Sequence, residues 1–274
     1  MKLTIGMCCY DDYDGVYFTI QSIRMYHKEI LKDVEFVIIN NNPQSKSGEA
    51  TNKLKNWIQE PCQIINFTDY QSTSLRNKIF EYANTPYCLS TDCHVLFESG
   101  SLRKLIDFFD TGKDCGNLLQ GPLVYDNMKG ISTHFELEWR GNMWGTWATD
   151  DRGLDPDTEP FEIPSQGLGC FACRTSNWLG FNPSFRGFGG EEGYIHEKYR
   201  RIGKKTLCLP FLRWLHRFER PTGVPYPLTL DSRIRNYLIG FTELGLDIQP
   251  IKEHFRDKFP QERMDDLLRS LSIR

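Results

Sequence analysis

The stretch "LTIGMCCYDDYDGVYFTIQSIRMYHKEILKDVEFVII", residues 3–39, decides the fold class. It opens with a short apolar, β-prone run at 3–9, continues with helix-like apolar spacing at 15–27 and returns to a β-prone run at 34–39. A strand, a helix and a second strand in this order form a βαβ unit, in which the strands run parallel and the crossover is right-handed. The stretch therefore predicts an α/β protein built around a parallel sheet.

The alternation of strand and helix patterns continues through the first half of the chain. Further β-prone runs lie at 62–67 and 87–91, and further helix-like segments lie at 49–59 and 73–84. Beyond residue 112 the pattern loosens, and it predicts a strand at 118–125, a strand, turn and helix at 167–180, a helix at 189–203 and one or two helices in 231–274. We expect a mostly parallel central sheet flanked by helices, with C-terminal helices.

Composition narrows the class of protein. Of the 274 residues 39% are hydrophobic, and 33 Lys and Arg against 36 Asp and Glu leave a net charge of -3, which argues against binding nucleic acid by bulk charge. No apolar run approaches the roughly 20 residues that span a bilayer, and the N-terminus lacks a signal-peptide pattern. The nine cysteines form no regular framework and fit reduced thiols. These features predict a cytoplasmic protein without a membrane span.

The stretch "YCLSTDCHVLF", residues 87–97, breaks its strand pattern with Asp92 and His94. Residues two apart on an extended segment point the same way, so the carboxylate and the imidazole converge at the end of the strand. Alone the pair is a weak signal. Its place at a strand end, where α/β sheets bind their ligands, favours a functional role.

Two later stretches carry residues of related chemistry. In "FGGEEGYIHEKYRR", residues 188–201, a glycine pair permits close backbone approach to a ligand and delivers Glu191 and Glu192 at a helix start. In "LRWLHRFER", residues 212–220, His216 is flanked by the arginines Arg213, Arg217 and Arg220. Both stretches are candidate parts of one site.

Together these motifs resemble the GT-A nucleotide-sugar glycosyltransferases, nearest the polypeptide N-acetylgalactosaminyltransferases and related to the family-two enzymes. The D-x-H at 92–94, the Gly-Gly-Glu-Glu turn at 189–192 and the histidine of "HRFER" match family motifs in consistent order. In "STSLRNKIFEYANTPY", Arg76 and Asn77 match the R-N of the segment that precedes the D-x-H strand. The collinear order is far more specific than any single motif.

The resemblance covers roughly residues 3 to 220. It implies a GT-A glycosyltransferase domain with a Rossmann-like sheet at 1–222, followed by a C-terminal helical extension at 223–274. It also implies an enzyme of the hexosyltransferase kind, which moves a sugar from a nucleotide-sugar donor, a UDP-sugar by expectation, to an acceptor hydroxyl.

The resemblance further implies a metal site and a donor site. Asp92, His94 and His216 would bind Mn²⁺, or Mg²⁺, under the diphosphate, where a Lewis acid neutralises developing charge. Seven residues would contact the donor: Asn40, Arg76, Asn77, Gly189, Gly190, Arg217 and Arg220. Asn40 stands where the family usually has an aspartate that reads uracil, and its neutral amide still offers hydrogen bonds to a base edge.

The acid after Gly-Gly-Glu resembles that of inverting relatives, so Glu192 is expected to act as general base, and Glu191 to bind sugar or acceptor hydroxyls. The other interpretation is that Glu192 caps the following helix. The acceptor stays open among a glycan, a protein hydroxyl, a small molecule and a modified nucleobase. Three tryptophans either stack on it or belong to a half-buried core: Trp139, Trp144 and Trp147.

Two other interpretations use the same residues. The first is a catalytically inactive module that binds nucleotide-sugar or carbohydrate, which the retention of all three metal ligands disfavours. The second is a structural zinc protein that uses His94 and His216 with Cys93 or Cys208 and unfolds without its ion. A lone CxxC, Cys170 and Cys173, is predicted to be buried thiols.

Overall fold

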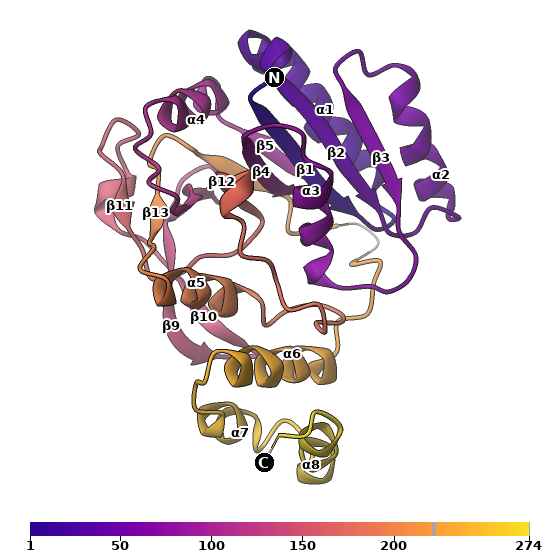
Figure 1. Cartoon of the computed structure of the whole chain (residues 1–274), viewed down its shortest axis with the longest axis vertical. Helices are drawn as coiled ribbons and strands as arrows, with labels where there is room; N and C mark the ends of the chain where they lie inside the picture. Colours follow the sequence, from indigo (N-terminus) through magenta and orange to yellow (C-terminus); the bar gives the residue numbers. More distant parts are fainter. Residues whose placement is uncertain (221–222, 274) are drawn as a thin grey trace.

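The computed structural model describes residues 1–220 and 223–273, and it confirms a large, mostly parallel sheet flanked by helices (Figure 1). The strands lie in the order β11, β13, β6, β12, β4, β1, β2, β3. Strands β12 and β11 run antiparallel to their neighbours. The bounds are β1 Leu3–Cys9, β2 Val34–Asn40, β3 Cys62–Asn66, β4 Tyr87–Asp92, β6 Leu118–Gln120, β11 Phe161–Glu162, β12 Cys170–Arg174 and β13 Thr206–Cys208.

The carboxyl ends of the central strands meet at one edge of this sheet. Strand β1 pairs in parallel with β4, with Cys8 opposite Asp92, and with β2, with Cys9 opposite Asn40. All residues of β2 are buried, as expected of a parallel strand covered on both faces. Every loop that follows β1, β2 or β4 therefore begins at the same edge.

Helices cover the two faces of the sheet. The bounds are α1 Tyr13–Tyr26, α2 Lys46–Lys53, α3 Arg76–Tyr82, α4 Ser101–Asp110 and α5 Glu192–Arg201. Apolar side chains of α1 and α4 pack on one face, and those of α3 and α5 pack on the other. A Cβ at Gly6 of β1 would lie 1.9 Å from Ile79 of α3, so this glycine allows α3 to pack directly on the strand.

Two smaller sheets complete the region around the carboxyl edge. One contains β5 Val95–Phe97, β14 Trp214–His216, β7 Leu123–Val124 and β8 Ile131–Ser132, and the other pairs β9 His134–Arg140 with β10 Met143–Ala148. The strand predicted at 118–125 is thus two strands, because the chain leaves the large sheet at Gly121. A Cβ there would lie 1.8 Å from the carbonyl oxygen of Leu212.

The C-terminal region forms three helices where the sequence predicts one or two: α6 Leu230–Glu243, α7 Gln249–Phe255 and α8 Gln261–Ser270. They share an apolar cluster of their own, against which Trp139 and Trp144 pack, and they lie below α5 and the β9–β10 ribbon in Figure 1. The helix expected at the end of 167–180 is absent from the described chain, where only a short 3-10 turn at 175–177 follows β12.

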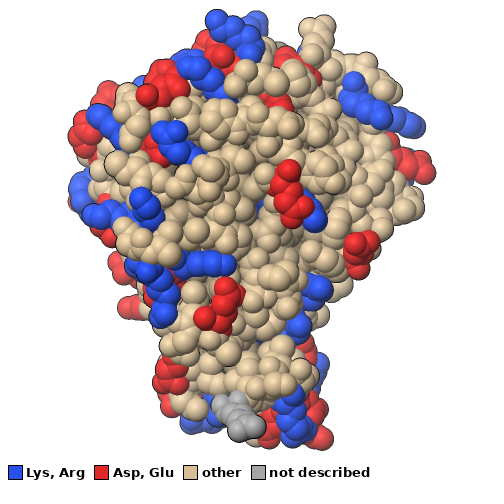
Figure 2. All heavy atoms as spheres, in the orientation of Figure 1, with Lys and Arg blue, Asp and Glu red and all other residues tan. Residues whose placement is uncertain are grey.

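The visible surface mixes both signs of charge. Figure 2 shows Lys and Arg side chains interspersed with Asp and Glu around a broad uncharged area, consistent with the balanced composition. None of the described helices combines the length and the apolarity needed to cross a bilayer.

Candidate functional site

A cavity of about 380 Å³ lies at the carboxyl ends of β1 and β4. Its walls come from the β1–α1 connection, the glycine turn before α5, the end of β14 and the start of α6. The charged and imidazole side chains that line it are Asp12, Arg76, Asp92, His94, Glu191, Glu192, His216, Arg220 and Arg233. This is where ligands of α/β sheets bind.

The three predicted metal ligands come together in this cavity. Nε2 of His94 lies 3.1 Å from Nε2 of His216, which lies 3.2 Å from Oδ2 of Asp92. A divalent ion about 2.0–2.2 Å from each atom would leave neighbouring ligand atoms about 3 Å apart. The spacing therefore fits one shared ion.

The charges of the cluster also suit a metal. Burial raises the pKa of Asp92, but Arg76 and the two histidines outweigh burial and hold this pKa below its usual range. Nη2 of Arg76 donates to Oδ1 of Asp92 at 2.8 Å, which leaves Oδ2 toward His216. Burial lowers the pKa of His94 despite the nearby acids, so its imidazole is neutral at neutral pH. One carboxylate and two imidazoles form a ligand set that accepts Mn²⁺.

The glycine turn places two carboxyl groups at the cavity. Gly189 and Gly190 have φ values of +93° and +89°, which residues with a Cβ rarely adopt. Helix α5 begins at Glu192, and the residue in the cap position is Glu191, whose side chain makes no capping hydrogen bond. Glu192 lies in the first turn of α5, where the helix dipole favours a carboxylate, so its position fits the helix-start interpretation as well as a role in the cavity.

Glu191 is a buried acid with a free oxygen. Its exposed fraction is 1%, Oε1 lies 3.6 Å from Nη1 of Arg76, and Oε2 has no hydrogen-bond partner among the described residues. Burial and then the charge of Glu192 raise the pKa of Glu191 to about 8, against the opposing effect of Arg76. A protonated carboxyl at the cavity wall suits a hydrogen bond to a ligand hydroxyl.

Replacing Glu191 with Gln should raise the free energy of unfolding of the metal-free protein more at pH 8 than at pH 5. The difference between the two pH values should be up to about a few kcal/mol. The pKa of Glu191 is about 8 in the folded protein against an ordinary value of 4.5. The unfolded chain therefore loses this proton first, and the free energy of unfolding of the wild type falls between these pH values. Urea unfolding at both pH values measures the effect, and a difference between variant and wild type that does not change with pH would contradict it.

Asn40, predicted to contact the donor base, is not among the residues that line the cavity. Its side chain is fully buried, and Nδ2 donates to the carbonyl of Gly48 at 2.9 Å and to Oδ1 of Asn52 at 3.1 Å. The amide is thus used to hold α2 against the end of β2. The next residue, Asn41, lines the cavity instead, because successive residues of an extended segment point to opposite sides.

Asn77 and Arg217 also point elsewhere. Oδ1 of Asn77 accepts from the indole of Trp178 at 3.0 Å and from the backbone of Phe181 at 2.9 Å, so this amide fixes the segment after β12. Nη2 of Arg217 donates to Oδ1 of Asp12 at 2.7 Å, and neither Asn77 nor Arg217 is among the cavity-lining residues of the described chain. Their predicted donor contacts are therefore not supported by geometry.

The tryptophans divide between the two interpretations. The rings of Trp139 and Trp144 lie 5.0 Å from Tyr237 and Phe241 of α6, respectively, and belong to the half-buried C-terminal core. Trp147 lines the cavity, with its ring 4.4 Å from that of Phe135. The sequence pattern does not separate them, because Trp139 lies on β9, Trp144 and Trp147 lie on β10, and the pairing of the two strands shifts register between residues 144 and 146.

Several cavity residues were not expected from the sequence. Asp12 lies in the connection between β1 and α1, and an acidic side chain just after the strand that pairs with the strand of Asp92 is the signal that would have found it. The predicted C-terminal extension also contributes to the wall, through Tyr226, Leu228, Arg233 and Tyr237.

Of the two cysteines named for a structural zinc site, Cys93 lies beside a histidine, with Sγ 3.5 Å from Nδ1 of His94, and Cys208 does not. Cys208 belongs to a separate apolar cluster with Phe161 and Ile163. Cys170 and Cys173 are buried in different core clusters, on opposite faces of the sheet. The thiols of Cys170, Cys173 and Cys208 are thus core side chains, as predicted for the CxxC pair.

Known structures share this fold. GalNAc-T7, crystallised with UDP, GalNAc and Mn²⁺, superposes with a TM-score of 0.66 at 17% identity over 93% of this chain, which spans 54% of the length of that protein. TarS 1-349 of S. aureus in complex with UDP-GlcNAc gives 0.59 at 12% identity, covering 99% and 80% of the two chains. The mannosyltransferase PcManGT from Pyrobaculum calidifontis, in complex with GDP-Man and Mn²⁺, gives 0.59 at 11%, covering 99% and 74%. No curated protein matches in sequence.

The sequence itself matches a family model. The model described as glycosyl transferase family 2 matches residues 4–176, from β1 through the D-x-H to the end of β12. The match covers more than half of the chain and includes the strands whose carboxyl ends form the cavity. The protein therefore belongs to glycosyl transferase family 2.

Proposed function

We propose that the protein transfers a sugar from a nucleotide-sugar donor, a UDP-sugar by expectation, to an acceptor hydroxyl with inversion, and that it depends on Mn²⁺ or Mg²⁺. The observation that carries the proposal is the convergence of Asp92, His94 and His216 in a cavity whose wall also holds Glu191 and Glu192. Membership of glycosyl transferase family 2 supports the reaction class.

The basic side chains suit a diphosphate beside the metal site. A bound ion supplies Lewis-acid neutralisation of the leaving diphosphate. Arg220 lines the cavity with Nη2 2.8 Å from Nε2 of His94, so its charge lies where phosphate oxygens would bind. Arg76 is 8% exposed and is held by Asp92 and Glu191. Its first role is therefore to keep Asp92 ionised and in place.

The two carboxyl groups of the turn take different roles. Glu192 is partly exposed in the cavity, and no ion pair to it is found among the described residues. Its carboxylate is therefore free to accept the proton of the acceptor hydroxyl while the hydroxyl oxygen attacks the anomeric carbon. Glu191, with its raised pKa and free Oε2, binds a hydroxyl of the sugar or acceptor. The glycines before them give that sugar close access to the backbone.

The aromatic part of the wall suits a ring-bearing acceptor. Trp147, Phe135 and Phe218 line the cavity beside His216, whose ring lies 4.3 Å from that of Phe218. Such faces stack on sugar rings and on bases. Among the acceptor classes, this favours a glycan or a nucleobase over a protein hydroxyl or a small molecule.

Replacing Asn40 with Ala should lower the free energy of unfolding by about 1–3 kcal/mol, because two buried hydrogen bonds are lost, and should leave donor affinity nearly unchanged. Asn41→Ala is the matched comparison, because it also loses two hydrogen bonds, from Nδ2 to the carbonyls of Phe67 and Tyr70, and it should in addition weaken donor binding, since Asn41 lines the cavity. Urea unfolding and calorimetric titration with the donor measure the two quantities. If Asn40→Ala strongly lost donor affinity and kept its stability, the result would support the contact between Asn40 and the donor base that the sequence predicts.

The direct test is a screen of nucleotide-sugars with and without Mn²⁺, followed by acceptors. A true donor at about 100 times its dissociation constant should stabilise the fold by about 2.7 kcal/mol, and slow hydrolysis of that donor should require the ion. Stabilisation without hydrolysis or transfer to any acceptor class would favour the inactive binding module. Absence of both effects for every donor would contradict the proposal.

A further inference from the structure

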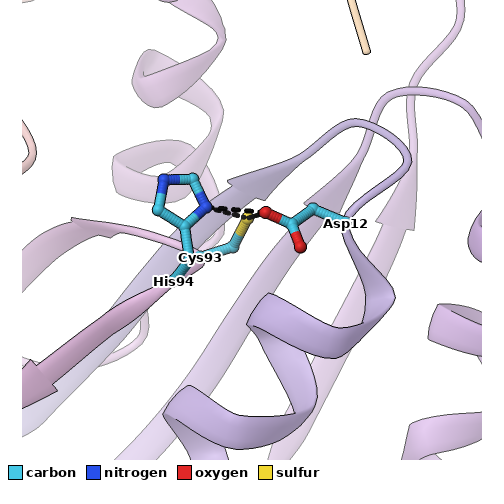
Figure 3. Close-up of side chains that lie close together, drawn as sticks. All are labelled: Asp12, Cys93 and His94. Carbon is cyan, nitrogen blue, oxygen red and sulfur yellow. Dashed lines mark hydrogen bonds and ion pairs between the residues drawn. The ribbon is translucent and has the colours of Figure 1, made fainter. Parts of the chain in front are cut away.

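We propose that Asp12 is a positioning residue that orients His94 toward the metal, an inference that rests on the proposed function. Figure 3 shows the Asp12 carboxylate directed at the His94 ring, and Oδ2 lies 2.7 Å from Nδ1. Asp12 accepts, so Nδ1 carries the hydrogen and Nε2 keeps its lone pair. This Nε2 lies 3.1 Å from Nε2 of His216 on the side of Asp92, and Nη2 of Arg220 lies 2.8 Å from the same nitrogen. A carboxylate behind a ligating histidine fixes its tautomer and ring orientation.

Asp12 is itself held firmly enough to serve this role. It is 9% exposed, and Oδ1 accepts from the backbone N–H of Gly15 at 3.0 Å and from Nη2 of Arg217 at 2.7 Å. Arg217 directly follows the metal ligand His216. The carboxylate of Asp12 therefore links the start of α1, the D-x-H segment and the residue after β14.

A second metal ion is the competing use of the same atoms. Sγ of Cys93 lies 3.7 Å from Oδ2 of Asp12 and 3.5 Å from Nδ1 of His94, so the three residues form a possible ligand group. The carboxylate and the imidazole are already at hydrogen-bond distance, however, and Arg217 and Arg220 place positive charge beside the carboxylate. Both observations favour positioning over a second cation.

The decisive variant is Asp12→Ser. Serine still caps α1, but its side chain is too short to reach His94, so capping is separated from positioning. Affinity for Mn²⁺, measured by calorimetry or electron paramagnetic resonance, should fall about 10–100-fold, while the variant still folds without metal. Nitrogen-15 NMR of the histidines should show His94 as the Nδ1–H tautomer in the wild type and as a mixture in Asp12→Ser.

Asp11→Asn is the matched control. Asp11 accepts from Asn42 and Ser45 and is not among the lining residues of the described cavity. Its variant should bind Mn²⁺ like the wild type. If Asp12→Ser binds the ion equally well, the inference is wrong while the proposed function stands. Two ions per wild-type chain, one of them lost in Asp12→Ser, would also overturn it in favour of a second site. A wild type that binds no ion would instead contradict the proposed function.

Discussion

Replacing Asp92 or His216 with Ala is expected to lower the rate of sugar transfer by a factor of about 10³ or more. Under the proposed function, a bound ion would contribute several kcal/mol to stabilising the leaving diphosphate, and each 1.36 kcal/mol of barrier is about tenfold in rate. Oδ2 of Asp92 and the two Nε2 atoms lie within one coordination sphere, so loss of either ligand leaves an incomplete site. Asp92→Ala also removes the partner of the buried Arg76 guanidinium.

Single-turnover rates with saturating donor and Mn²⁺, together with the affinity for the ion, measure this effect. His254→Ala is the matched control, because His254 contacts the carbonyl of Gly141 at 2.8 Å and is not among the residues that line the described cavity. It should retain both the rate and the affinity. A fully active His216→Ala enzyme that still requires the ion would show that His216 is not a ligand.

Glu192→Gln is expected to lower turnover by about 10²–10⁴, or roughly 3–5 kcal/mol of barrier, with donor affinity nearly unchanged. Glutamine keeps the size of the side chain but cannot take a proton from the acceptor hydroxyl. The wild-type product should have the anomeric configuration opposite to that of the donor, which the proton coupling at the anomeric carbon reports.

Glu197→Gln, on the same helix, is the control for this change. Glu197 pairs on the surface with Arg200 and Arg201, and such pairs contribute about 0–1 kcal/mol to stability, so its activity should stay normal. Retention of the donor configuration in the product, or an active Glu192→Gln enzyme, would show that Glu192 is not the general base. The neighbouring Glu191 would then have to be tested in the same way.

Local periodicity was enough to predict β1 to β4 and α1 to α3, although β5 and α4 were not predicted. The strand expected at 3–9 is β1, Leu3–Cys9, and those expected from 34, 62 and 87 begin at the same residues. Their patterns are strong because a parallel strand is apolar on both faces. The division of 118–125 and the number of C-terminal helices were not predictable, because they depend on where the chain meets Leu212 and on packing against Trp139 and Trp144.

Some features of the candidate site could likewise be predicted from local sequence, and others could not. The sequence by itself determined that Asp92 and His94 share one side of a strand end, and that glycines deliver two acids to a helix start, since both follow from local geometry. Only the tertiary structure decided that His216 lies beside His94, because β14 pairs antiparallel with β5 across a long sequence separation. It also decided that Asn41 rather than Asn40 reaches the cavity and that Asp12 supports His94. Such contacts depend on strand pairing and on the direction of single side chains, which no local pattern encodes.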